Sequence, residues 1–317
     1  MYEDVIEVFE VPEEGRAYVA DFLSVKEIAA IRTMGRTAYL PEELQTLLSP
    51  LTANPTKLIA EAYSRAVFNK VKEDGQVKFQ TANFYRRLAF FAQYEPDAWT
   101  AIPRPHREAM DAWYVKIYAE GARSRLEVVR KNPEQLPEQL IENAYFVTLD
   151  EAFDIIDKLE HDPYRVPCNC KSVAMNCEKP RNVCVLFEKG INSEWDRGHG
   201  QALTKAEAKE LLRFANKNGL MQTSELRRAI CNCDGCCCYP IRASRMIGAR
   251  GFWPKKLYNI VWDEGRCVNC KKCTSICNFR AFIEKEGKVF FERENCWGCA
   301  ICKSNCPVNA ISLERAE

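Results

Sequence analysis

In the first half of the chain, apolar residues recur at the three- and four-residue intervals of amphipathic helices. Ser24 and Glu27 have the spacing of a capping box before the segment VKEIAAIRTM, and Pro41 begins the segment EELQTLL. An Asn-Pro pair starts a longer helix, which we expect over residues 54–74. The pattern therefore predicts that residues 22–75 fold mainly as short helices.

The pattern changes after this stretch. Gly75 ends the predicted helix, and residues 76–81 (QVKFQT) alternate as a β-strand does. A second helical block covers residues 106–132, and Thr148 with Glu151 forms a capping box for another helix. Three helices followed by a strand resemble the order of a winged helix.

The winged-helix resemblance implies a role in binding DNA or in docking a protein. The candidate recognition helix would carry three basic residues: Arg65, Lys70 and Lys72. Charge argues against DNA, because residues 1–160 contain 19 Lys and Arg against 27 Asp and Glu, whereas residues 161–317 have a net charge of +9. Nonspecific DNA affinity comes from neutralising phosphates with a basic surface. We therefore expect the first half to dock a protein.

The cysteines occupy only the second half of the chain. All 17 lie between Cys168 and Cys306. No apolar run approaches the roughly 20 residues of a membrane span, and the acidic start is unlike a signal peptide. These features predict a cytoplasmic protein without a membrane span. In the cytoplasm, clustered cysteines more often bind metals or take part in redox chemistry than form disulfides.

The most specific signal is a repeated cysteine motif near the C-terminus. The segments CVNCKKCTSIC, from Cys267, and CWGCAICKSNC, from Cys296, share the spacing C-x2-C-x2-C-x3-C with an offset of 29 residues. Ala281 and Ala310 keep this offset. Residues 257–316 resemble the bacterial two-cluster ferredoxin domain, with a short β-hairpin between the repeats and Glu286-Gly287 at its turn.

In such ferredoxins the fourth cysteine of each motif ligates the other cluster. The resemblance therefore implies two [4Fe-4S] clusters with crossed ligands. The first would be held by Cys267, Cys270, Cys273 and Cys306, and the second by Cys296, Cys299, Cys302 and Cys277. A pair of structural zinc sites is the alternative, but zinc fingers usually separate their C-x2-C pairs by a longer loop.

One position departs from the ferredoxin pattern. Pro307 follows Cys306 as the resemblance implies, but Asn278 stands in place of the equivalent proline after Cys277. Asparagine adds a backbone N–H and a polar side chain near a cluster sulfur. Because hydrogen bonds to the sulfurs tune the potential, we expect the two clusters to differ in potential.

Nine further cysteines lie in the middle of the chain, five of them between residues 231 and 238. A helix predicted from Thr204 to Gly219 would bring the two groups of cysteines together. The possible arrangements are two further [4Fe-4S] clusters with one spare thiol, one cluster with supporting cysteines, a zinc site or a non-cubane centre. We favour at least one more iron–sulfur centre over zinc, and the pairing stays open. Asp234 lies within this run of thiols, so an unusual carboxylate ligand is one interpretation, and a solvated turn residue is the one we favour. The candidate ligands are Cys168, Cys170, Cys177, Cys184, Cys231, Cys233, Cys236, Cys237 and Cys238.

The whole chain resembles the multidomain 4Fe-4S dicluster ferredoxin-type proteins of anaerobic microbes. The predicted fold class is α+β, with three domains. Residues 1–160 form a helical, winged-helix-like docking domain, residues 161–256 a cysteine-rich metal-binding subdomain, and residues 257–317 the two-cluster ferredoxin domain. A basic segment, residues 241–256, could dock an acidic redox partner or serve as a linker.

No set of residues with a catalytic pattern emerges, and the three histidines have no partner at ligand spacing. We expect an electron-transfer protein that relays low-potential electrons between a soluble carrier and a partner redox enzyme or larger oxidoreductase complex. The first alternative is a reductase or reductive activase that uses an unusual iron–sulfur centre in the middle domain. The second is a redox-sensing regulator that binds DNA.

Overall fold

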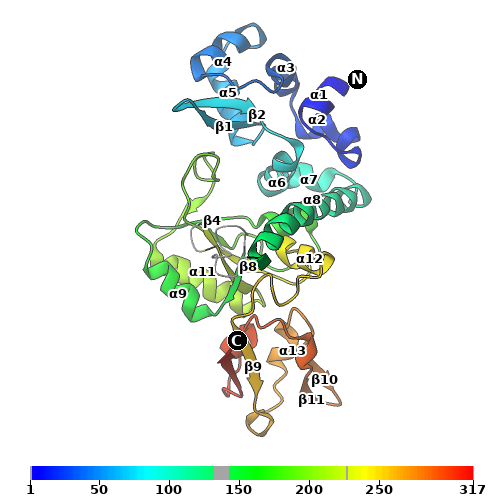
Figure 1. Cartoon of the computed structure of the whole chain (residues 1–317), viewed down its shortest axis with the longest axis vertical. Coiled ribbons are helices and arrows are strands. Elements are labelled where there is room, and N and C mark those ends of the chain that lie inside the picture. Colours follow the sequence, from blue (N-terminus) through cyan, green and yellow to red (C-terminus); the bar gives the residue numbers. More distant parts are fainter. Residues whose placement is uncertain (1, 132–142, 226–227, 317) are drawn as a thin grey trace. The chain divides into compact units, whose positions relative to one another are not determined.

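The computed structural model describes residues 2–131, 143–225 and 228–316 of the chain (Figure 1). Contacts divide the chain into two compact units. The first unit contains Met1–Tyr114, Ser172–Ala174 and Lys189–Gly200, and the second contains Val115–Lys171, Met175–Glu188 and Gln201–Glu317. The candidate metal ligands all belong to the second unit.

The first unit is mainly helical and has one two-stranded sheet. The capping box of Ser24 and Glu27 and the start at Pro41 are present as predicted. The helix α8 (Arg104–Lys131) begins in this unit and continues into the second. The other elements are α1 (Glu3–Val8), α2 (Val19–Phe22), α3 (Val25–Met34), α4 (Pro41–Leu48), α5 (Pro55–Ser64), β1 (Phe68–Glu73), β2 (Gln76–Thr81), α6 (Phe84–Tyr94) and α7 (Pro96–Ala101), with short 3-10 turns at Glu13–Tyr18 and Ser49–Leu51.

The prediction of one helix over residues 54–74 is wrong in its second half. The helix α5 ends at Ser64, and the following segment forms β1, which pairs with β2 in an antiparallel hairpin. Asp74 and Gly75 both have positive φ, as the turn of a two-residue hairpin requires. The Asp-Gly pair is thus a hairpin turn and not a helix stop.

The three candidate recognition residues therefore do not lie on a helix. Arg65 caps the end of α5, and Lys70 and Lys72 lie on β1. Arg65 forms ion pairs with Glu27 at 2.5 Å and Glu95 at 3.0 Å, so its charge is already compensated inside the unit. Lys70 pairs with Asp196 at 2.9 Å. The DNA-binding alternative loses its recognition helix, and a relation to winged helices stays a prediction.

Aromatic residues of α6 form the core of the first unit. Phe84, Phe90 and Phe91 are fully or almost fully buried, and Phe22 packs against Phe84 and Phe91. The aromatic segment around residue 90 therefore stabilises the fold and offers no exposed apolar surface.

The second unit is built on a six-stranded antiparallel sheet in the order β3-β7-β8-β5-β4-β6. Its strands are β3 (Tyr145–Val147), β4 (Tyr164–Val166), β5 (Cys184–Leu186), β6 (Gln201–Ala202), β7 (Met221–Glu225) and β8 (Ala229–Cys233). Two helices, α9 (Leu149–Asp157) and α11 (Lys205–Lys217), pack against each other and contribute apolar side chains to one core with β5 and β8.

The caps of these two helices agree with the sequence. Thr148 and Thr204 each form the predicted capping box with the glutamate three residues later. Gly219 has a φ of +77°, as expected just after the end of α11. Two shorter helices, α10 (Asn169–Ala174) and α12 (Tyr239–Met246), begin immediately after cysteines of the middle region.

The C-terminal part of the second unit contains two small sheets. The strand β9 (Tyr258–Trp262) pairs with β12 (Ile311–Arg315), and β10 (Phe282–Lys285) pairs with β11 (Lys288–Phe291) around the predicted Glu286-Gly287 turn. The helices α13 (Lys272–Ile276) and α14 (Ile301–Ser304) connect them, with 3-10 turns at Glu264–Arg266 and Arg293–Asn295.

The 29-residue repeat of the sequence is also a repeat of backbone conformation. Positive φ occurs at equivalent positions of both halves, in the pairs Asn269 and Gly298, Lys271 and Ala300, and Arg280 and Asn309. At Gly298 an added Cβ would lie 2.6 Å from the Tyr258 carbonyl oxygen, so this position requires glycine. Each motif therefore wraps its loop in the same way.

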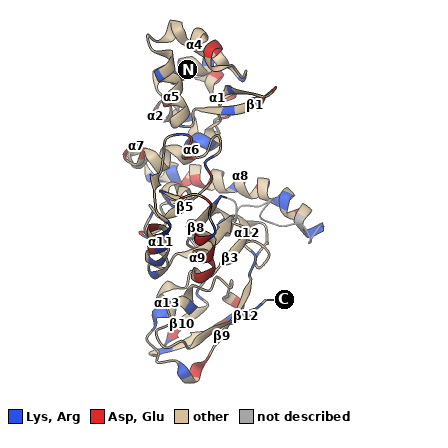
Figure 2. Ribbon diagram, turned by 90° about the vertical axis from the view of Figure 1, so that its left-hand side faces the viewer, with Lys and Arg blue, Asp and Glu red and all other residues tan. Residues whose placement is uncertain are grey.

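The mixed helix-and-sheet fold class is confirmed. Among the described residues, no helix has the length and apolar character needed to cross a membrane. Basic residues occur at the C-terminal end of α8, where Arg130 and Lys131 lie in the last turn (Figure 2).

Candidate metal centres

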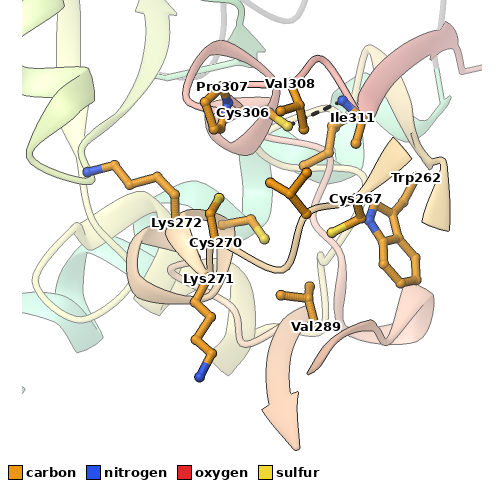
Figure 3. A pocket seen from close by; sticks show the side chains of 13 residues that line it. Trp262, Cys267, Cys270, Lys271, Lys272, Val289, Cys306, Pro307, Val308 and Ile311 are labelled. Carbon is orange, nitrogen blue, oxygen red and sulfur yellow. Dashed lines mark hydrogen bonds between the residues drawn. The ribbon is translucent and has the colours of Figure 1, made fainter. Parts of the chain in front are cut away.

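Four cysteines surround a cavity beneath β9 and β12. Cys267, Cys270, Cys273 and Cys306 line it, together with apolar side chains that include Trp262 and Val289. Figure 3 shows the labelled cysteines around one space, while the Lys271 and Lys272 side chains extend away from it. We refer to this site as the first four-thiol cavity.

A second four-thiol cavity lies in the same domain. It is lined by Cys277, Cys296, Cys299 and Cys302, with Phe279, Phe282 and Trp297 among its apolar walls. Each cavity thus receives three cysteines from one motif and the fourth from the other. The four cysteines of each cavity are the same as those of one predicted crossed ligand set. That they bind a cluster stays a prediction.

The backbone supports the two crossing cysteines in the same way. The amide of Ala281 donates to Cys277 Sγ at 3.2 Å, and the amide of Ala310 donates to Cys306 Sγ at 3.3 Å. These alanines are the repeated pair in the sequence. N–H donors directed at sulfur stabilise negative charge on cluster thiolates and raise the potential of a cluster.

The residues of both cavities fit a [4Fe-4S] cubane. Four thiols face one apolar space, which is the donor set that such a cluster requires. Burial raises the pKa of Cys299 to about 12 and that of Cys273 to about 11. Metal binding must therefore displace protons from these thiols. When bound, a cubane supplies one-electron oxidation and reduction.

The two cavities differ in exposure. Cys270 of the first cavity is exposed, whereas Cys299 and Cys302 of the second are buried. An exposed ligand brings a cluster close to the protein surface, where it can exchange electrons with another molecule. The first four-thiol cavity is therefore the more accessible of the two.

Six of the nine middle cysteines form a closed ring of thiol contacts. Each of the six thiols interacts with two others, and the Sγ atoms of Cys233 and Cys238 are hydrogen-bonded at 3.4 Å. The order around this six-thiol ring is Cys168, Cys170, Cys238, Cys233, Cys231 and Cys184. Six thiolates exceed the four that one cubane takes, so the ring has the donors for a larger polynuclear centre.

A buried lysine compensates the charge of this region. Lys171 is 1% exposed and donates to the Asn232 carbonyl oxygen at 2.7 Å. Burial alone would lower the pKa of Lys171, but Cys168, Cys184 and Asp234 outweigh that effect and raise it well above its usual value. Lys171 therefore stays charged among the thiols. In the sequence, the only indication of this role is that Lys171 directly follows the candidate ligand Cys170 in the segment CNCKS.

The other three middle cysteines join a carboxylate instead of the ring. The ligand atoms of Cys177, Asp234, Cys236 and Cys237, which we call the Asp234 group, all lie within 4.8 Å of one another. The expectation that Asp234 is a solvated turn residue is wrong, because it is only 1% exposed. Its carboxylate Oδ1 accepts the backbone N–H groups of Cys236 and Cys237.

Asn278 joins the second four-thiol cavity to the middle cysteines. Its Oδ1 accepts the Gly235 amide at 3.2 Å and Lys179 Nζ at 2.7 Å, and its Nδ2 donates to the Gly219 carbonyl oxygen at 3.0 Å. The side chain contacts these groups rather than a cluster sulfur. Gly235 lies between Asp234 and Cys236, so the substitution of proline by asparagine creates a direct junction between two cysteine regions.

The basic segment of residues 241–256 is a structured part of the second unit. Arg245 donates to the Gly235 carbonyl oxygen at 2.6 Å and lies over the rings of Phe279 and Trp297. Arg250 also lies over Trp297. These two arginines therefore pack around the junction instead of forming a free linker.

Comparison with known proteins identifies the C-terminal part. The family model for the 4Fe-4S dicluster domain matches residues 261–313. Pyruvate synthase subunit PorD of Methanocaldococcus jannaschii is 37% identical over 68 residues, which are 21% of this chain and 77% of that protein. A ferredoxin of Rickettsia felis is 35% identical over 60 residues, which are 18% of this chain and 53% of the ferredoxin.

Larger oxidoreductases match over a small part of their length. The archaeal-type glutamate synthase [NADPH] of Thermotoga maritima is 31% identical over 55 residues, which are 17% of this chain and 11% of that enzyme. No solved structure matches the chain. The four-thiol cavities, the repeated motif and these relatives lead to one conclusion: through its C-terminal residues, the chain belongs to the 4Fe-4S dicluster ferredoxin family.

Proposed function

We propose that this protein relays single electrons at low potential between a soluble carrier and a partner redox enzyme. The observation that carries the proposal is the junction at Asn278. It places the second four-thiol cavity in hydrogen-bond contact with the loop that bears Asp234, Cys236 and Cys237. A ferredoxin domain bonded in this way to the backbone of a loop that carries further thiols has the organisation of a relay.

The exposure of the ligands suggests a direction for the relay. Electrons would enter at the first four-thiol cavity, where Cys270 is exposed, and pass to the buried second cavity. From there the Asn278 junction leads toward the middle cysteines. We further propose that the six-thiol ring holds an additional iron–sulfur centre, because soft thiolates favour iron–sulfur clusters and the neighbouring C-terminal part has the thiol sets for two of them.

The relatives support a partner enzyme. One of them is named as a subunit of pyruvate synthase, and another is named as an NADPH glutamate synthase. We propose by analogy that this chain serves an oxidoreductase of its own. The acidic, cysteine-free first half would dock that enzyme.

Electron transfer by the anaerobically purified full chain tests the proposal. The chain is reduced stoichiometrically and mixed with an oxidised low-potential ferredoxin in a stopped-flow instrument. We expect bleaching of the clusters and transfer to the acceptor, and a much slower transfer in Cys306→Ala, which loses the entry cluster. Intact clusters that cannot be reduced, or that exchange no electrons with any carrier, would contradict the relay.

A further inference from the structure

We propose that the Asp234 group binds a single tetrahedral divalent ion of the zinc class, separate from every iron–sulfur centre. The site consists of three thiolates, from Cys177, Cys236 and Cys237, and one carboxylate, from Asp234. The ligand atoms of these four side chains all lie within 4.8 Å of one another, and in the described part of the chain this is the group of cysteine, histidine and acidic residues gathered so closely. The proposal goes beyond the relay and does not depend on it.

The spacing of the sulfur atoms fits one ion. Cys237 Sγ lies 3.8 Å from both Cys177 Sγ and Cys236 Sγ. Tetrahedral zinc with Zn–S bonds of about 2.3 Å separates its sulfur ligands by about 3.8 Å. The carboxylate is equally close, because Asp234 Oδ2 lies 3.8 Å from Cys177 Sγ and Oδ1 lies 3.3 Å from Cys236 Sγ. The four donors thus already surround a space of the size of one ion.

The ferredoxin domain provides an internal comparison. A cubane binds each of its four thiolates through a different iron, so the sulfurs stand farther apart than on one ion. In the described C-terminal part, the eight ferredoxin-type cysteines form no thiol–thiol hydrogen bond and line two cavities. The Asp234 group instead has two sulfur–sulfur distances of 3.8 Å and a carboxylate within the same 4.8 Å, which is the spacing of ligands on one tetrahedral ion. Its geometry therefore suits a mononuclear site.

The carboxylate is oriented as a metal ligand. The backbone amides of Cys236 and Cys237 hold Asp234 Oδ1 at 3.0 and 2.5 Å, which fixes the plane of the carboxylate. Oδ2 then remains available on the side of Cys177. Such hydrogen bonds to a ligating carboxylate are the usual support that fixes ligand direction around a metal. A sulfur-rich donor set with one carboxylate suits zinc among the common divalent ions.

The surrounding charges match a site of this kind. Three thiolates and one carboxylate around a divalent ion carry a net charge of about −2, which is costly to bury without counter-charges. Lys171 Nζ lies 3.9 Å from Asp234 Oδ2, and both side chains are 1% exposed. Arg245 is bonded to the adjacent Gly235 carbonyl oxygen. Two cations thus face the site.

An ion here would tie together two distant segments beside the junction. Cys177 follows α10, whereas the other three ligands lie between β8 and α12. Asn176 already donates to the Cys236 carbonyl oxygen at 3.0 Å. The ion would therefore rigidify the loop on which Gly235 meets Asn278. Cys236 is exposed, which gives the ion a route of entry.

X-ray absorption at the zinc edge of the anaerobically purified full chain tests the proposal, because it is insensitive to iron. We expect about one zinc per chain with three sulfur neighbours at about 2.3 Å and one oxygen at about 2.0–2.2 Å. In Asp234→Cys the oxygen shell should be replaced by a fourth sulfur. In Asp234→Ala we expect zinc affinity, measured by chelator competition, to fall on the order of 100-fold. The exposed Asp162→Asn is the matched control.

Asp234→Cys keeps four ligands, so the test stands even if Asp234→Ala fails to fold. The proposal would be overturned by any of three results: the absence of zinc, a wild-type zinc ion coordinated by no oxygen, or an Asp234→Cys variant whose zinc ligands are unchanged. Iron signals that change in Asp234→Cys while zinc is absent would assign the group to an iron–sulfur cluster. The EPR signals of the ferredoxin domain are recorded in parallel, so loss of the relay and loss of the zinc site are distinguished.

Discussion

The C-terminal cavities and the middle cysteines use the same side chain in two different ways. In the C-terminal part, eight thiols line two open cavities, and a local motif supplies three of the four thiols in each. In the middle, six thiols contact one another in a ring, and three others gather around Asp234. The comparison teaches that cysteine content alone does not define a centre, because the backbone decides whether thiols line an open cavity or contact one another.

The origin of the ligands explains the difference. The repeated loops of the C-terminal part reproduce the same positive-φ positions, so short segments suffice to shape each cavity. The middle thiols come from separate elements: Cys184 lies on β5, Cys231 and Cys233 lie on the neighbouring strand β8, and Cys238 precedes α12. Strand pairing, and not motif spacing, brings them together.

The largest expected effect is the loss of one ferredoxin cluster. Cys277→Ala removes a ligand from the second four-thiol cavity, although Cys277 belongs to the first motif. We expect EPR of the reduced variant to lose the second cluster selectively, because crossed ligation makes Cys277 its fourth ligand. Cys306→Ala is the matched control and should lose the first cluster instead. Loss of the first cluster in Cys277→Ala and of the second in Cys306→Ala would show instead that each motif ligates its own cluster.

Replacing the buried cation of the middle region comes next. Lys171→Met leaves the surrounding thiolates without a counter-charge, so we expect unfolding free energy to fall by about 3–5 kcal/mol. The middle iron should be lost more readily, while the EPR signals of the ferredoxin domain persist. Chemical denaturation and iron analysis measure the two effects. Lys217→Met, at an exposed site, should behave like the wild type, and equal losses in both variants would argue against the role of Lys171.

A smaller effect is expected at the junction between the two regions. In Gly235→Ala the new Cβ would lie 2.5 Å from the Asn278 carbonyl oxygen, so one backbone segment must move. We expect a loss of about 1–3 kcal/mol, as for other overpacked sites. Gly121→Ala, which meets only Arg125 Nη2 at 3.8 Å inside α8, should instead be neutral or stabilising by up to about 1 kcal/mol. Thermal denaturation compares the two.

Asn278→Ala is expected to destabilise the protein no more than Gly235→Ala does. It removes the side-chain bonds to Gly235, Gly219 and Lys179, at a cost of about 1–3 kcal/mol for the groups left unpaired. Both ferredoxin clusters should remain, whereas electron transfer toward the middle centre should slow. Asn295→Ala, whose side chain bonds only within its own loop, is the control. Loss of the second cluster in Asn278→Ala would show that Asn278 supports ligation and not the junction.

Much of the local structure could be predicted from the sequence. The capping boxes at Ser24, Thr148 and Thr204 and the Glu286-Gly287 turn each depend on a few neighbouring residues. The grouping of thiols in the two cavities is not local, and its prediction came from the resemblance to two-cluster ferredoxins. The first strand of the hairpin after α5 was missed, because the predicted helix was extended through it as far as the Asp-Gly turn.

The middle sites could not be resolved in the same way. Asp234 and Cys177 are 57 residues apart, and only the sheet brings them together. A polar residue followed by glycine usually marks a solvated turn, which concealed the burial of Asp234. Asn278 was recognised as unusual, but its contacts with Gly219 and Gly235 depend on how the C-terminal part packs against the sheet.

Iron and acid-labile sulfide, counted in the anaerobically purified full chain and assigned by Mössbauer spectroscopy, test the central claim most directly. A chain that carries two ferredoxin cubanes and a further iron–sulfur centre should contain more than about eight iron atoms and eight sulfides. All of the iron should be reducible, and Cys277→Ala should remove about four iron atoms. A total of about eight, with no iron outside the ferredoxin domain, or iron without labile sulfide would contradict the account.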